Sequence, residues 1–109
     1  GLELIENLRA GCVGMILAPE LIDLTVAIYE SFVSGDEVTA EASYREVLPT
    51  IVFIMQSLES LICYGKRLFG VRAGIEIHDR APAMRPTAFG LELVRGHARR
   101  AGLFEASRR

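Results

Sequence analysis

Few side chains in this 109-residue sequence could perform chemistry, and they are scattered along the chain. Lys66 is the only lysine, and a lysine amine is the nucleophile that forms Schiff bases with keto acids. Its apolar neighbours repeat with helical spacing, which places Lys66 near the end of a predicted helix. A structural or surface lysine and a Schiff-base lysine are the two alternatives.

Histidine and cysteine offer no recognisable site. His78 and His97 are isolated from each other and from any cysteine or carboxylate at ligand spacing, so we expect no metal site. Cys12 and Cys63 lie in apolar contexts without a CxxC spacing, which favours two buried free thiols over a disulfide or a metal pair. Free thiols agree with a reducing cytoplasm, where we expect the protein to reside.

The charge balance gives no reason to expect nucleic acid or a membrane as partner. The net charge is −2 and the pI is about 5.7. The basic run "RGHARR" over residues 95–100 falls in the last turns of a predicted helix, where the helix dipole favours positive charge. We therefore expect a solvated helix end there rather than an RNA or phosphate site. The longest apolar run, residues 51–55, is far too short to span a bilayer.

The sequence is unusually apolar for its length. Half of the residues are apolar and the mean hydropathy is +0.29. A domain of about 100 residues buries only roughly two-thirds of its unfolded surface, so part of this apolar surface is expected to meet a partner.

One segment, residues 12–18, predicts a β-strand. It is uninterrupted by charge and has Gly14 inside it, which is typical of a parallel-sheet strand covered on both faces. A short helix that ends at Gly11 precedes it, and a helix from Pro19 to Gly35 follows it. No other segment predicts a strand, so the neighbours that this one needs are missing from the sequence.

The rest of the chain predicts helices. Asp36 can cap a long helix in which Pro49 should cause a kink or a break after Leu48. Ser57 can begin the next helix, which we expect to end at Gly70.

The C-terminal part predicts an irregular connection and a closing helix. Residues 71–86 carry one glycine and two prolines and read as irregular. Residues 87–101 form the last predicted helix, with a Schellman-like ending at Gly102. Residues 105–109 are expected to be a frayed tail.

Five stretches resemble one enzyme family in order and in spacing. The chain is similar to the C-terminal third of the dihydrodipicolinate synthase/N-acetylneuraminate lyase family, the pyruvate-dependent class I aldolases. "GCVGMILAPE" resembles the eighth barrel strand of this family. The other four stretches resemble the helices and connections that follow that strand: "YESFVSGDEVTAEASYREVLPTI", "GKRLFG", "RAPAMRP" and "ELVRGHARRAGLF".

The resemblance implies a fold that is mainly α in this chain. Residues 1–35 would be the terminal α-β-α piece of a (β/α)8 barrel, the TIM barrel, and contribute its last strand and helix. Residues 36–109 would form a three-helix C-terminal extension.

The resemblance also implies where the chemistry of the parent enzyme lies. A lysine on the sixth strand forms a Schiff base with pyruvate, a tyrosine on the fifth strand relays protons, and a loop on the second strand holds the carboxylate. All three would lie upstream of Gly1, so we expect no catalytic residue, cofactor or metal ligand in this sequence. The resemblance also places Lys66 on a helix of the extension and favours the structural interpretation.

Residues 12–18 are the one segment that would reach the substrate pocket, because barrel active sites lie at the carboxyl ends of strands. Gly14, Ile16 and Leu17 are its predicted wall residues, and the resemblance turns the Ile16 carbonyl toward the Schiff-base lysine. Many relatives carry a small or hydroxyl residue where Leu17 stands. This difference argues against a hydrogen bond from this position to a polyhydroxylated substrate and leaves an apolar or structural role as the alternative.

The resulting hypothesis is a C-terminal segment of a lyase that acts on pyruvate or a related 2-keto acid by aldol cleavage, condensation or dehydration. The segment would be inactive alone, and its partners would be the remainder of the barrel or other copies of the chain in a homo-oligomer. The alternative is a stand-alone, homodimeric helical binding module derived from the same family.

Overall fold

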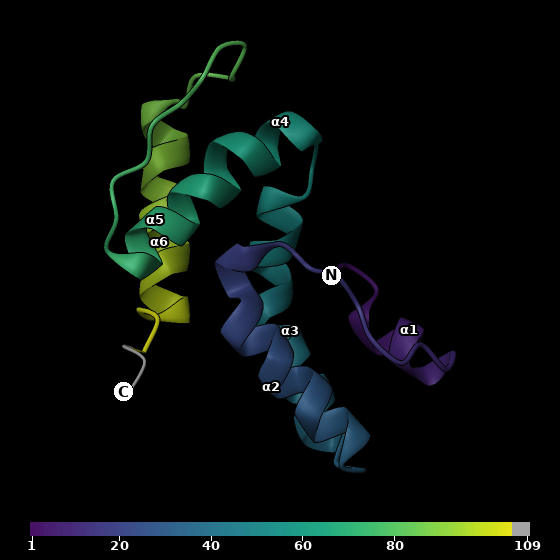
Figure 1. Ribbon diagram of the computed structural model, residues 1–109. Coiled ribbons are helices and arrows are strands. Elements are labelled where there is room, and N and C mark those ends of the chain that lie inside the picture. Colours follow the sequence, from purple (N-terminus) through teal and green to yellow (C-terminus); the bar gives the residue numbers. More distant parts are fainter. Residues whose placement is uncertain (106–109) are drawn as a thin grey trace. The chain divides into compact units, whose positions relative to one another are not determined.

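The computed structural model describes residues 1–105, and this part of the chain is mainly α-helical (Figure 1). Its contacts divide the chain into two units, Gly1–Phe53 and Ile54–Arg109. The prediction of a mainly α protein is therefore confirmed. The predicted division after residue 35 concerns the origin of the segments, which the contacts do not address, and it stays a prediction.

The first unit contains three α-helices and a 3₁₀ turn. They are α1 (Leu4–Arg9), η1 (Pro19–Leu21), α2 (Ile22–Val33) and α3 (Glu37–Ile54). The predicted stops are confirmed, since Gly11 and Gly35 have φ values of 97° and 92°, which favour glycine. The Asp36 Oδ1 atom accepts the Thr39 N–H at 3.1 Å and caps α3.

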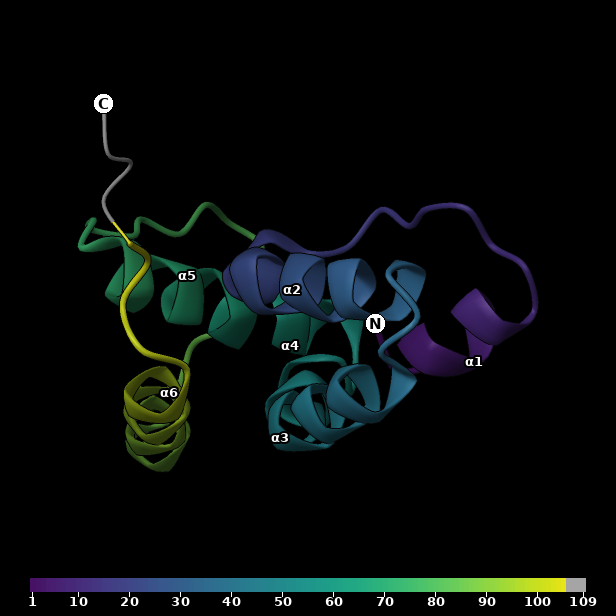
Figure 2. The same ribbon diagram turned by 90° about the horizontal axis from the view of Figure 1, so that it is seen from below.

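The core of the first unit lies between the facing apolar sides of these helices. Figures 1 and 2 show α2 and α3 side by side. The Tyr44 hydroxyl of α3 donates to the Leu2 carbonyl, and Arg9 lies 3.4 Å from Glu41, so α1 is tied to α3. The buried apolar residues are Leu4, Ile5, Leu8, Leu21, Ile28, Ala40, Tyr44, Val47 and Ile51.

Of the two effects predicted for Pro49, a kink or a break, the break after Leu48 does not occur, because α3 continues through Pro49. Proline removes one N–H from the helical ladder, but Val47 and Ile51 on either side are buried and hold the helix in place. The chain leaves α3 only after Ile54.

Residues 12–18 do not form a strand in this chain. Figure 2 shows them as a long loop between α1 and α2, and no strand occurs in residues 1–105. A strand requires a hydrogen-bonded neighbour, which this part of the chain does not supply. The predicted burial of Cys12 is wrong for the same reason, since no sheet covers its exposed side chain, whereas Cys63 is buried as predicted.

The second unit contains one long helical run and a closing helix. The run begins as α4 (Leu58–Ser60), passes through a π-helical turn, η2 (Leu61–Gly65), and continues as α5 (Lys66–Ala73). The closing helix is α6 (Ala88–Ala101), which packs on α5. Ser57 caps the run as predicted, its hydroxyl accepting the Ser60 N–H at 3.0 Å. The Thr87 hydroxyl caps α6 in the same way.

The predicted helix end at Gly70 is wrong, because α5 runs on to Ala73 and stops at Gly74, where φ is 68°. Gly70 has a different role: a Cβ there would overlap the Ile77 side chain, so glycine allows the irregular segment to approach α5. The predicted irregular connection accordingly begins at residue 74 rather than 71.

The predicted end of α6 at Gly102 is confirmed, but its conformation is not left-handed helical. The φ and ψ of Gly102 are 79° and 173°, so the chain extends at this point. This lets the Phe104 N–H reach the Arg72 carbonyl at 3.0 Å. Of the predicted frayed tail, residues 106–109 lie outside the described residues.

No single helix in residues 1–105 is both long and apolar enough to span a membrane. The α3 helix and the run from Leu58 to Ala73 meet the length and composition test only when taken together across the bend that separates them.

Candidate functional site

The loop formed by residues 12–18 and the helix α2 enclose an open pocket of about 310 Å³ in the first unit. The Tyr29 hydroxyl of α2 donates to the Val13 carbonyl at 2.9 Å and holds the loop over the helix. The pocket is lined by Leu4, Gly14, Met15, Leu17, Ile22, Thr25, Val26 and Tyr29.

The lining of this pocket is suited to packing rather than to acid–base chemistry. Its side chains are mostly apolar, and the Thr25 hydroxyl already donates toward the carbonyls of Leu21 and Ile22 at 3.2 and 3.1 Å. The pocket can therefore accept an apolar group from a neighbour, and Tyr29 is its only ionisable lining residue.

The structure brings two of the three predicted wall residues to this pocket. Gly14 and Leu17 line it, whereas Ile16 turns away, and its side chain is fully exposed with a relative exposure of 103 %. Val13 is also 90 % exposed. The loop therefore presents one side to α2 and leaves apolar side chains without cover among the described residues of this chain.

One carboxylate of the first unit is buried. Glu20, in the 3₁₀ turn before α2, is 4 % exposed. Burial raises the pKa of its carboxyl above 4.5, because the charged form loses hydration. The sequence does not predict this burial, since a glutamate next to Pro19 is typical of the exposed first turn of a helix.

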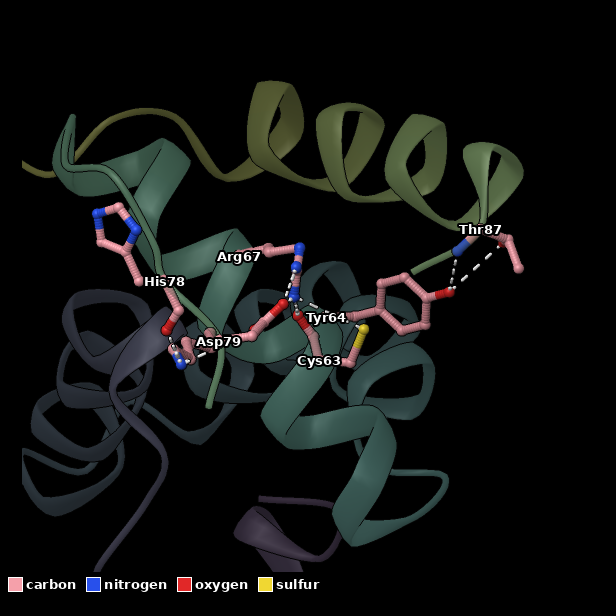
Figure 3. Close-up of polar contacts among 7 residues, drawn as sticks. Cys63, Tyr64, Arg67, His78, Asp79 and Thr87 are labelled. Carbon is pink, nitrogen blue, oxygen red and sulfur yellow. Dashed lines mark hydrogen bonds and ion pairs between the residues drawn. The ribbon is translucent and has the colours of Figure 1, made fainter. Parts of the chain in front are cut away.

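The second unit contains a cluster of cations around Asp79, shown in Figure 3. The Arg67 guanidinium binds both carboxylate oxygens of Asp79, one of them at 3.2 Å. The Lys66 Nζ atom donates to the His78 carbonyl at 2.7 Å and lies 3.9 Å from Asp79. These contacts fasten the irregular segment after Gly74 to α5.

The contacts around Asp79 hold the irregular segment on α5 and leave no group placed for nucleophilic chemistry. Arg67 holds the pKa of the Asp79 carboxyl below its usual range, and Asp79 in turn raises the pKa of Arg67, so both stay charged near neutral pH. The Lys66 amine lies on a helix, as predicted, and is directed at a backbone carbonyl.

Cys63 and Tyr64 lie beside this cluster (Figure 3). The Cys63 Sγ atom is buried 3.7 Å from Arg67, and burial raises the pKa of its thiol, so the reactive thiolate is disfavoured. The Tyr64 hydroxyl accepts the Thr87 N–H at 3.2 Å and supports the start of α6.

No group of three possible metal ligands occurs in the part of the chain that the structure describes. His97 is buried on α6, where its Nδ1 atom lies 2.8 Å from the Arg100 guanidinium. Burial and the charge of Arg100 lower the pKa of this imidazole.

The sequence pattern does not reveal the two arginines that organise the second unit, Arg67 and Arg72. Arg67 and Asp79 are twelve residues apart, and the buried Arg72 contacts carbonyls some thirty residues away. No local pattern predicts such pairs, although an arginine on the apolar side of a helix is a weak signal for Arg72.

No family model, curated protein or solved structure matches this chain. The resemblance to the pyruvate-dependent aldolases therefore stays a prediction from the residues themselves.

Proposed function

We propose that this chain is the C-terminal segment of a Schiff-base-forming lyase that acts on pyruvate or a related 2-keto acid and that residues 12–18 are its last barrel strand. In the complete enzyme these residues pair with neighbouring strands, and the segment from residue 36 onward supports the barrel from outside. The Schiff-base lysine belongs to the upstream part of the enzyme.

The observation that carries this proposal is the unmatched apolar loop. Residues 12–18 combine the composition of a strand covered on both faces with side chains, Val13 and Ile16, that are almost fully exposed. Leaving two such side chains in water forfeits roughly 2 kcal/mol or more each compared with burial. A neighbouring sheet would recover this free energy, and the apolar pocket against α2 would accept its side chains.

Over residues 15–17 the side chains alternate as in a barrel strand, whereas Gly14 also lines the pocket and Val13 is exposed. Met15 and Leu17 line the pocket beside α2, while Ile16 points away from it. In a barrel, alternate side chains of a strand face the outer helices and the interior, so Ile16 would face the interior. This supports Ile16 as the wall residue nearest to a substrate.

The test begins with the complete reading frame. Its product is incubated with pyruvate and reduced with borohydride, and peptide mass spectrometry locates the adduct. We expect one reduced pyruvyl group on a lysine upstream of Gly1 and none on Lys66. The 109-residue chain alone should trap no pyruvate and show no aldolase or dehydratase activity.

The matched control is Lys66→Arg in the complete protein. Arginine keeps a donor for the His78 carbonyl and a cation near Asp79, so trapping and activity should persist. An adduct on Lys66, activity of the 109-residue chain, or a reading frame without an upstream strand lysine would refute the proposal. A frame that begins near Gly1 would instead favour the stand-alone binding module.

A further inference from the structure

The two units of the chain carry opposite charge. Residues 1–53 contain two Lys and Arg against nine Asp and Glu, which gives −7, and residues 54–109 contain ten against five, which gives +5. The overall charge of −2 conceals this asymmetry. Each unit therefore repels its own kind and attracts the other in a second copy of the chain.

On the second unit, positive charge meets exposed apolar surface in one groove. Two open hollows of about 410 and 280 Å³ share Val71 and Arg95 as lining residues, so they are adjacent between α5, α6 and the segments that follow them. We call the two hollows together the arginine groove. Its exposed apolar lining residues are Val71, Ile75 and Leu103, which are 44, 53 and 72 % exposed.

The groove has two arginines that are free to bind an anion. Arg95 and Arg99 are exposed, lie one turn apart on α6, and form no hydrogen bond or ion pair with any residue in the range 1–105. Arg67 and Arg72 are different, because the first is paired with Asp79 and the second is directed at backbone carbonyls. The groove thus suits a partner that is both acidic and apolar.

The turn between α2 and α3 of the first unit has this composition. Val33 and Val38 are 59 and 83 % exposed, and the exposed carboxylates of Glu30, Asp36 and Glu37 lie beside them in sequence. Asp36 also accepts the Thr39 N–H, and Glu37 lies 3.6 Å from Arg9, so a partner would share these two carboxylates with contacts inside the first unit. This acidic turn, residues 30–38, includes none of the residues that line the pocket under the 12–18 loop. The two proposals therefore rest on different residues.

We propose that the chain forms a two-fold dimer in which the arginine groove of each copy binds the acidic turn of the other. Val33 and Val38 cover Val71 and Leu103, and the carboxylates meet Arg95 and Arg99. A two-fold axis makes the two contacts equal by symmetry. The proposal does not depend on the lyase function.

Sedimentation velocity of the 109-residue chain tests this dimer. We expect a dimer in ~10 mM salt, where the Debye length is ~30 Å, and a dissociation constant at least roughly tenfold higher in ~1 M salt, where it is ~3 Å. Arg95→Glu/Arg99→Glu should weaken the dimer by at least roughly tenfold. Arg80→Glu/Arg85→Glu is the matched control, since it makes the same charge change at exposed positions outside the groove and should weaken the dimer much less.

A charge exchange gives the sharpest outcome. Glu30→Arg/Glu37→Arg should also yield monomers, and mixing this variant with Arg95→Glu/Arg99→Glu should restore a dimer, because one contact is then reversed in charge and the other is native. Circular dichroism confirms that each variant is folded. A monomer under all conditions, equal effects of the two arginine pairs, or no restoration on mixing would overturn the proposal. Association that is equally tight in ~10 mM and ~1 M salt would overturn it as well.

Discussion

Arg72 shows how one side chain joins two distant parts of the second unit. It is 1 % exposed, its Nε atom donates to the Gly102 carbonyl at 2.7 Å, and its Nη2 atom lies 3.3 Å from the Ala101 carbonyl. Its guanidinium carbon lies 4.1 Å from the centre of the Phe104 ring. A cation at the carboxyl end of α6 also complements the helix dipole.

Replacement of Arg72 by methionine should destabilise the protein by about 2–4 kcal/mol. The carbonyls at the end of α6 lose a buried charged donor, and methionine cannot replace it. Urea unfolding followed by circular dichroism measures the change. The exposed Arg80→Met is the control and should stay within about 0.5 kcal/mol of the wild type. Similar values for the two variants would refute the capping role of Arg72.

Glu20 gives the first unit a predictable dependence on pH. Burial raises its folded pKa above 4.5, so the folded state holds the proton more tightly than the unfolded state does. The contribution of Glu20 to stability is therefore greatest below about pH 4.5 and is lost as pH rises through the folded pKa.

Glu20→Gln should accordingly raise the free energy of unfolding at about pH 7 and change it little at about pH 3, where the native carboxyl is also neutral. Urea unfolding at the two pH values measures the difference. Glu46→Gln, at an exposed position of α3, should show no such dependence. An equal effect of Glu20→Gln at both pH values would contradict the role of burial.

At the scale of elements, the position of a helix end depends on nearby residues in the sequence. The packing of one helix on another depends also on glycines, which have no side chain and allow a close approach. Gly90 and Gly96 lie on the same helix, α6, in different surroundings. A Cβ at Gly90 would overlap the Tyr64 ring and hydroxyl, while a Cβ at Gly96 would meet nothing closer than the Arg99 guanidinium at 3.9 Å. Gly90 thus lets the start of α6 approach Tyr64.

These two glycines form a matched pair of substitutions. Gly96→Ala should stabilise the protein by about 0.5–1 kcal/mol, because alanine loses less conformational freedom in a helix. Gly90→Ala should instead destabilise it by roughly 1–3 kcal/mol, because Tyr64 must move. Thermal and urea unfolding measure both changes. Stabilisation by both substitutions would show that Tyr64 yields without cost and would refute the close-packing argument.

At the scale of the whole molecule, the environment of the loop formed by residues 12–18 is expected to differ between the isolated chain and the complete enzyme that we propose. Ile16 has no cover among residues 1–105, so Ile16→Asp should change the stability of the isolated chain by less than about 0.5 kcal/mol. In the complete barrel the same side chain would be enclosed, and an unpaired carboxylate there should prevent folding or activity.

Expression and unfolding of Ile16→Asp in both forms measure this contrast. Leu8→Asp is the control in the isolated chain, because Leu8 is 5 % exposed and its replacement should unfold the first unit. A complete enzyme that tolerates Ile16→Asp would refute the assignment of residues 12–18 as a barrel strand.

The sequence alone determined most helix boundaries of this protein, since caps and stops act within a few residues. Asp36, Ser57 and Thr87 begin helices as expected, and Gly11, Gly35 and Gly102 end them. α3 continues past Leu48 and α5 past Gly70 for one reason, because neighbours brought together by folding, rather than adjacent residues, decide whether a helix continues there.

Only the tertiary structure decided which polar groups are buried and which apolar groups are not. The pairs of Arg67 with Asp79 and of Arg72 with the end of α6 join residues twelve to thirty positions apart, and periodicity carries no information at that distance. Glu20 is buried although glutamate is usually exposed, and Cys12 is exposed although cysteine is usually buried. Burial depends on which segments fold over a residue. The same reason leaves residues 12–18 with the composition of a strand and no sheet to join.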